Sequence, residues 1–326
     1  MLARFKHRSL SIPGSLLDRL LVWSGALLVL AVMGFGAYYY VDRQGRTRTP
    51  SLTEQTIARF EQAVRATPGD VNARVSLGDL YYTNHRYAES AVQYRAALAI
   101  KPDSVLTLMG LGRALLATGD EAGAIEHLTK VINLTKNDEI PGDVTQAAQY
   151  YLGRAYLDQQ RPADAVEHLK VAVAISRMDA DAWELLGTAF LADGKVDEAI
   201  QALSTAVRYV PNYTEAYQQL AAAYQRKGQA PQRAYAMGMV AYGKGNLGEA
   251  ADQLEAAVKG GGTFANAYVG LGLVREARNE RAQAVAAFQE ALRLEPDNFN
   301  AQAGVSRLTN SKPPPHATAG PKGVTP

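Results

Sequence analysis

The chain has 326 residues, 47% of them hydrophobic, so it can bury a large core. Its formal net charge of +2 gives no overall reason to expect a nucleic-acid partner. It has no cysteine, which excludes disulfides, thiolate metal sites, a cysteine nucleophile and a lipidated cysteine anchor.

The N-terminal segment is basic and contains a long uncharged stretch. Residues 20–41 carry no charge and, at about 1.5 Å each, would span roughly 33 Å as a helix, enough to cross a hydrocarbon core. Trp23 and Tyr38 stand near its ends, where such rings favour the membrane interface. We therefore expect a basic tail at 1–19, a transmembrane helix at 20–41 and a linker at 42–50. A cleaved signal peptide is the alternative.

The basic residues that flank this stretch set the expected topology. They stand on both sides in nearly equal number, so the positive-inside rule gives only a small margin. We expect the N-terminus in the cytoplasm and residues 42–326 outside it. The reverse topology, with this larger part in the cytoplasm, stays open.

From residue 51 the sequence repeats itself. The stretch "AWELLGTAFLADGKVDEAIQALSTAVRYVPN" (182–212) is the fullest copy. A Gly or Ala after Leu or Met recurs with spacings of 34, 41, 34, 34, 17 and 34, and twelve residues later comes a small residue, then a large one after four more. The recurring small residues are Gly78, Gly112, Gly153, Gly187, Ala221, Gly238 and Gly272.

This period and these phases resemble the tetratricopeptide (TPR) repeat. The resemblance implies an all-α fold, a right-handed α-solenoid of TPR helical hairpins, here preceded by a single transmembrane helix. Gly on the first helix, facing Ala on the second, would let the two helices approach closely. Gly119, Gly194, Gly228 and Gly245 fall between the helices, where a left-handed residue ends the first.

The array departs from the regular period in places. We expect a solenoid at 51–309, with seven extra residues placed in 136–144 and altered packing near Gly228–Arg233, where one unit has lost its second helix. A disordered Pro- and Gly-rich tail follows at 310–326. The expected units are a half repeat at 51–68, repeats from 71, 105, 146 and 180, a half repeat at 214–230, repeats from 231 and 265, and a capping helix at 299–309.

The sequence favours no enzyme. Repeats occupy nearly all of the chain after residue 50. The sequence contains no P-loop, zinc-protease or serine-hydrolase motif. His127 and His168 recur in "AIEHL" and "AVEHL", so we interpret them as solvent-facing products of duplication rather than metal ligands. We expect no catalytic residue, no cofactor and no metal.

The TPR resemblance also implies a concave surface lined by the first helix of each unit. Aromatic side chains and Met there would supply contact area, and Arg would bind a carboxylate through two hydrogen bonds. The expected ligand is an extended or helical peptide with apolar anchors and an acidic residue. The alternative is that Tyr150 and Leu157 pack inside the array while the arginines are merely solvated. The candidate groove residues are Tyr82, Met109, Arg113, Leu116, Tyr150, Arg154 and Leu157.

The sequence thus predicts a membrane-anchored TPR scaffold that binds a protein or peptide partner and no nucleic acid. Membrane-tethered relatives of this architecture imply a role in assembling envelope or membrane complexes. Two alternatives stay open: a self-associating structural protein that forms a homo-oligomer, and an accessory subunit of a larger membrane enzyme.

Overall fold

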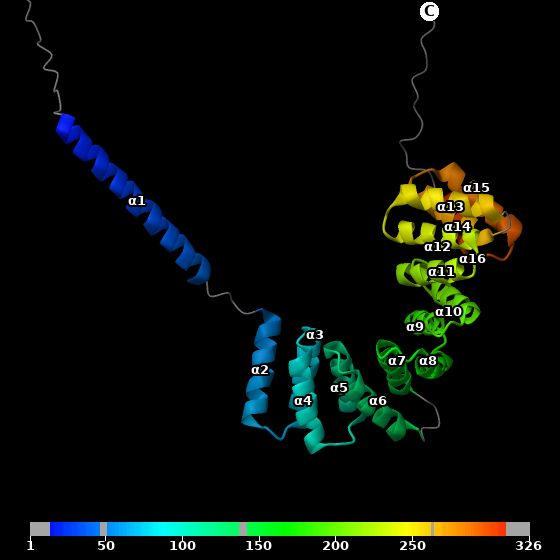
Figure 1. Cartoon of the computed structure of the whole chain (residues 1–326), viewed down its shortest axis with the longest axis horizontal. Coiled ribbons are helices and arrows are strands. Elements are labelled where there is room, and N and C mark those ends of the chain that lie inside the picture. The colour runs from blue at the N-terminus through cyan, green and yellow to red at the C-terminus, as the bar shows by residue number, and fades with distance from the viewer. Residues whose placement is uncertain (1–13, 46–50, 137–141, 262–263, 311–326) are drawn as a thin grey trace, which may run out of the picture. The chain divides into compact units, whose positions relative to one another are not determined.

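The computed structural model describes residues 14–45, 51–136, 142–261 and 264–310. Every secondary-structure element in these ranges is an α-helix (Figure 1), which confirms the all-helical fold class. Most of the basic tail and of the linker lies outside the described residues, as do residues 137–141 of the insertion and the tail after Asn310.

The chain divides into two units, residues 1–59 and 60–326. The first holds helix α1 (Gly14–Gly45), on which large apolar side chains such as Trp23 and Phe35 are exposed. In the described parts of the chain, no helix combines the length and the apolar character needed to cross a membrane. Residues 20–41 instead form the middle of a longer helix, so the transmembrane prediction is not supported.

The repeat array is built from short helices that follow one another closely. Ser51 starts α2 with a capping box: its hydroxyl accepts from the Glu54 backbone N–H, and its own N–H donates to the Glu54 carboxylate. The helices are α2 (Leu52–Ala66), α3 (Val71–Thr83), α4 (Tyr87–Ile100), α5 (Val105–Thr118), α6 (Glu121–Thr135), α7 (Asp143–Asp158), α8 (Pro162–Ile175), α9 (Ala180–Ala192), α10 (Val196–Tyr209), α11 (Thr214–Arg226), α12 (Ala230–Gly243), α13 (Leu247–Gly261), α14 (Ala265–Ala277), α15 (Arg281–Leu294) and α16 (Phe299–Asn310).

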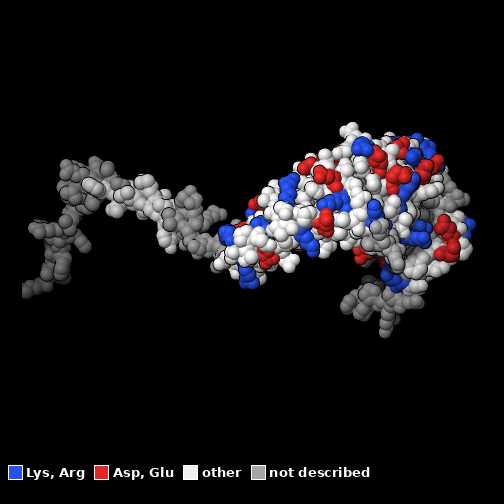
Figure 2. Space-filling model, turned by 90° about the horizontal axis from the view of Figure 1, so that it is seen from below, with Lys and Arg blue, Asp and Glu red and all other residues white. Residues whose placement is uncertain are grey.

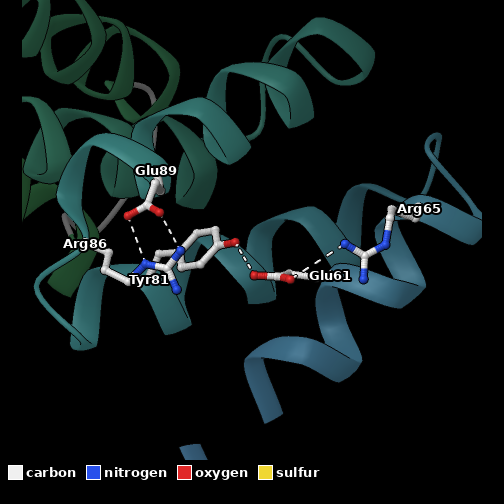
Figure 3. Close-up of polar contacts among 5 residues, drawn as sticks. All are labelled: Glu61, Arg65, Tyr81, Arg86 and Glu89. Atoms are coloured by element: carbon white, nitrogen blue, oxygen red, sulfur yellow. Dashed lines mark hydrogen bonds and ion pairs between the residues drawn. The ribbon is translucent and has the colours of Figure 1, made fainter. Parts of the chain in front are cut away.

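Polar contacts hold the end of α2 against α3 (Figure 3). The Tyr81 hydroxyl donates to the Glu61 carboxylate at 2.8 Å. The guanidinium of Arg86 lies 4.2 Å from the centre of the Tyr81 ring and is itself paired with Glu89. These contacts are partly exposed, so each adds little stability by itself.

Within each hairpin, a small residue on one helix receives a large side chain from the next. A Cβ added to Gly187 on α9 would lie 2.5 Å from Leu203 Cγ and 3.3 Å from the Ala199 carbonyl oxygen on α10. The absence of a side chain at Gly187 is therefore what lets the two helices pack this closely. The same relation joins Gly112 to Leu128, Gly153 to Leu169, Gly238 to Leu254 and Gly272 to Phe288.

The turns inside the hairpins use left-handed backbone, as the sequence predicts. Gly119, Gly194, Gly228 and Gly245 have φ between +70° and +79°. His85, Gln160 and Asn279 adopt φ of 57° to 62° in the corresponding turns. The turn geometry is thus kept even where no glycine is present.

The first helices of successive hairpins form one row. In it α3 contacts α5, α5 contacts α7, α7 contacts α9 and α9 contacts α11. The alternation then shifts, because α11 packs directly on α12, while α12 pairs with α13 and contacts α14 (Figure 1). Helix α12 therefore packs against α11 as a second helix would and at the same time forms the first helix of the next hairpin.

Candidate functional site

Arg113 on α5 lies between two tyrosine rings contributed by α3 and α7, its neighbours in the row of first helices. Its guanidinium carbon is 4.5 Å from the centre of the Tyr82 ring on α3 and 5.5 Å from that of Tyr151 on α7. A guanidinium at these distances is attracted by the electron-rich faces of the rings. The structure thus brings Tyr82 and Arg113 together and adds Tyr151, which the sequence did not single out.

The charge of Arg113 is not neutralised within the described part of the chain. Burial acts to lower the pKa of the guanidinium, but the hydroxyl groups of Tyr151 and Tyr82 outweigh it and leave the pKa raised. Arg113 is therefore charged at neutral pH. Its Nε atom is buried and has no hydrogen-bond partner among the described residues.

Arg154 is a second basic side chain without a described partner. It is exposed on α7 and forms no hydrogen bond or ion pair with the residues the structure describes. It lies close enough to Tyr150 to influence that hydroxyl, whose pKa burial raises to about 12. Tyr150 in turn packs edge-to-face on Tyr151, with ring centres 5.2 Å apart. Both arginines thus adjoin one tyrosine pair on α7.

The other predicted groove residues differ in what they expose. Met109 is 8% exposed and belongs to the core, so it offers little surface to a ligand. Tyr82 and Leu116 are half-buried against the core of α4 to α7. Tyr150 and Leu157 are half-buried against the core that begins at α8. The exposed parts of Tyr82, Tyr150 and the two leucines are therefore what remains for contact.

Two carboxylates of α9, Asp181 and Glu184, lie near Tyr150, and both accept hydrogen bonds from other residues. The Tyr213 hydroxyl donates to Asp181 at 2.6 Å, and the Thr188 hydroxyl donates to Glu184 at 3.0 Å. Burial raises the pKa of the Glu184 carboxyl. The positive charges on α5 and α7 are thus bordered by acidic groups on α9.

The two recurring histidines are half-buried, which corrects their interpretation as solvent-facing. A ring nitrogen of His168 lies 2.7 Å from the Gln149 side-chain oxygen, and its ring stacks on Tyr156 with centres 5.2 Å apart. Burial lowers the pKa of both His127 and His168. Within the described ranges, no group of three or more potential ligands is placed to hold a metal ion.

Stacked antiparallel hairpins with a glycine in each contact define a helical-repeat solenoid. The chain belongs to the tetratricopeptide repeat family. The model described as Tetratricopeptide repeat matches residues 54–105, 133–177, 152–214 and 235–301, together more than half of the chain. Figure 2 shows basic and acidic side chains interspersed over the face it displays.

Several solved structures are similar to this chain. A crystal structure of MamA is 26% identical, covers 53% of this chain and 97% of its own, and has a TM-score of 0.47. A tetratricopeptide repeat protein from Parabacteroides merdae ATCC 43184 is 16% identical, with 84% and 96% covered and a TM-score of 0.47. YrrB, described as a TPR protein with an unusual peptide-binding site, is 15% identical, with 75% and 96% covered and a TM-score of 0.40. A search of curated proteins finds no match.

Proposed function

We propose that this chain is a non-catalytic scaffold that binds a peptide segment of a protein partner along α3, α5 and α7. The observation that carries the proposal is the guanidinium of Arg113, which forms no ion pair with a carboxylate of the described residues and is held between the rings of Tyr82 and Tyr151. Arg154 adds a second free charge on the next helix of the row. The ligand is an acidic residue flanked by apolar side chains.

The arrangement suits recognition better than turnover. The rings restrict the guanidinium to few conformations, so little side-chain entropy is lost when it binds a carboxylate. Half-buried tyrosines around it exclude water and would strengthen that ion pair. None of the groups at this site is a nucleophile paired with a base, which is what covalent or general-base catalysis needs.

Selection of peptides from a random displayed library against the full chain tests the proposal. We expect enrichment of sequences with Asp or Glu next to aromatic or aliphatic residues. The double variant Arg113→Glu, Arg154→Glu is selected in parallel and should lose this enrichment, because two attractive charges become repulsive. Enrichment of the same acidic peptides by both proteins would overturn the proposal.

A matched control keeps the change in net charge but moves it away from the site. Arg177 and Arg233 are exposed, and neither forms a hydrogen bond or ion pair through its side chain with the described residues. The variant Arg177→Glu, Arg233→Glu should select the same acidic peptides as the unchanged protein. This comparison separates a local grip from general electrostatic attraction.

A further inference from the structure

The repeat array begins and ends on opposite halves of a hairpin. Phe60 on α2 stands one period of 34 residues before Tyr94 on α4, which is the second helix of its hairpin. Ser306 on α16 stands 34 residues after Gly272 on α14, which is the first helix of its hairpin. Among the described residues, the array therefore starts with a second helix at α2 and finishes with a first helix at α16.

The large side chain on a second helix packs between two first helices. Added Cβ atoms on Gly272 and Gly304 would lie 2.5 Å and 2.7 Å from the Phe288 ring, so Phe288 on α15 fills the space between α14 and α16. This packing leaves Phe288 0% exposed. The contact inside a hairpin thus joins a small residue on the first helix to a large residue on the second.

The corresponding faces of α2 and α16 are open. Ala63 on α2 is exposed and Phe60 is half-buried, whereas Tyr94 is only 2% exposed. Ser306 on α16 is exposed, whereas Gly272 is buried. The residues equivalent to Ala63 on the second helices of the complete hairpins are all 0% exposed: Ala97, Val131, Ala172, Ala206, Ala257 and Ala291. The two faces that pair inside the other hairpins are thus uncovered in a single copy.

The two open faces complement each other. Ser306 is small, as the glycines at this position are, and Phe60 is large, as its equivalents on the other second helices are. A side chain at the position of Ser306 is compatible with packing, because Ala221 occupies it on α11 and is 5% exposed against α12. Gln302 and Thr309, on the same side of α16 as Ser306, are exposed and polar. They keep a free end soluble, so pairing of the two faces is reversible.

We infer that copies of this chain assemble head to tail, with α16 of one copy and α2 of the next forming a complete hairpin. Phe60 then packs against Ser306 of the neighbouring copy, and both open faces are buried. Because each copy uses two different surfaces, the contact builds linear or ring-shaped assemblies rather than a symmetric dimer. The groove around Arg113 is not part of the contact, so every copy in the assembly keeps its own groove.

Sedimentation velocity of the full chain measures this assembly. We expect the mean mass to rise between about 1 µM and about 100 µM, the range in which small reversible interfaces associate. Ala63→Arg and Ser306→Arg each place a charge in one open face, at a position that is exposed in the single copy. Each should weaken association at least about tenfold, because pairing would bury an unpaired charge. Gln201→Arg, at an exposed position on α10 away from both ends of the array, is the matched control and should leave association unchanged.

A mixture of the two variants distinguishes head-to-tail assembly from other modes. The Ala63→Arg protein keeps an intact α16 face, and the Ser306→Arg protein keeps an intact α2 face. Equal amounts should therefore form one-to-one dimers and nothing longer, although each variant alone associates weakly. Circular dichroism checks that both variants are folded.

Three results would overturn the inference. The first is a mean mass that does not rise with concentration, and the second is a mixture of the variants that stays monomeric. The third is association that neither variant reduces, which would come from another surface, such as the exposed apolar side chains of α1.

Discussion

Gly187 and Leu203 are in such close contact that a Cβ on Gly187 would lie 2.5 Å from Leu203 Cγ. Leu203 is fully buried, and the Ala199 backbone carbonyl oxygen lies 3.3 Å from the same Cβ. We therefore predict that Gly187→Ala lowers the free energy of unfolding by about 1–3 kcal/mol through overpacking. Urea unfolding followed by circular dichroism measures the change.

Gly248→Ala is the control for this substitution. Gly248 also lies in a helix, α13, but the nearest atom to an added Cβ is 4.0 Å away. There the better helix propensity of Ala should leave stability unchanged or raise it by up to about 1 kcal/mol. An equal loss in both variants would mean that the Gly187–Leu203 contact does not set the hairpin spacing.

The start of α9 is tied to α7 through Asp179. Its carboxylate accepts from the Ala182 backbone N–H at 3.0 Å and from the Gln146 side chain at 2.7 Å. We predict that Asp179→Ala costs about 1–2 kcal/mol of unfolding free energy, since a cap and an interhelix bond are lost together. Asp120→Ala, which removes a cap bond to Gly123 and an exposed ion pair with Arg95, should cost less, because an exposed ion pair contributes little. Equal losses would contradict the role of Gln146.

Glu184 should make the protein more stable when its charge is removed. Burial raises the pKa of this carboxyl above its unfolded value, so its contribution is favourable below the unfolded pKa and is lost as pH rises through the raised one. Glu184→Gln should therefore increase the unfolding free energy at about pH 7, by about 0.5–1 kcal/mol, and the gain should vanish near pH 4. Asp252→Asn, at an exposed carboxylate on α13, should show no such gain.

His168 should give the array a stability that falls in mild acid. Burial lowers its pKa below the unfolded value, so the neutral ring contributes stability above the unfolded pKa, and this is lost as pH falls through the folded pKa. We predict that His168→Gln reduces the loss of unfolding free energy between about pH 7 and pH 5. Denaturant unfolding at both values measures it. An equal loss in both proteins would contradict this role of His168.

The repeat family and the all-helical class follow from the sequence because the close contacts repeat in phase. The residues equivalent to Gly187, Ala199 and Leu203 must keep the same separations in the other hairpins for the two helices to pack closely. This spacing can therefore be recognised from the sequence alone. The spacing of 17 between Ala221 and Gly238 likewise reflects a local constraint, since both residues lie in helices of the first-helix type.

The sequence could not give the surroundings of Arg113. The groove positions taken from the family place Tyr150 beside the arginines, whereas the α7 ring that faces Arg113, together with Tyr82 on α3, is that of the next residue, Tyr151. Which of two adjacent tyrosines turns toward the preceding helix depends on packing against both neighbours, and spacing alone does not record it. The burial of Met109 likewise depends on packing against the neighbouring helices and cannot be recognised from spacing alone.

A cavity of about 520 Å³, lined by residues of α10, α11, α12, α14 and α16, was also beyond sequence reasoning. Ser204 on α10 and Arg307 on α16 line the same space although they are far apart in the chain. Their approach depends on how successive hairpins rotate about the shared helix α12, and small changes at each contact add up. The local pattern predicts altered packing at this point but not the room that it opens.

A charge-swap titration tests the central claim most directly. A fluorescent acidic peptide from the selection is titrated by anisotropy with the full chain and with the Arg113→Glu, Arg154→Glu variant, and so is the same peptide with its acidic residue changed to Lys. We predict that the variant binds the acidic peptide at least about thirtyfold more weakly and recovers affinity for the Lys peptide. Equal affinity of both proteins for the acidic peptide would contradict a groove built around these arginines.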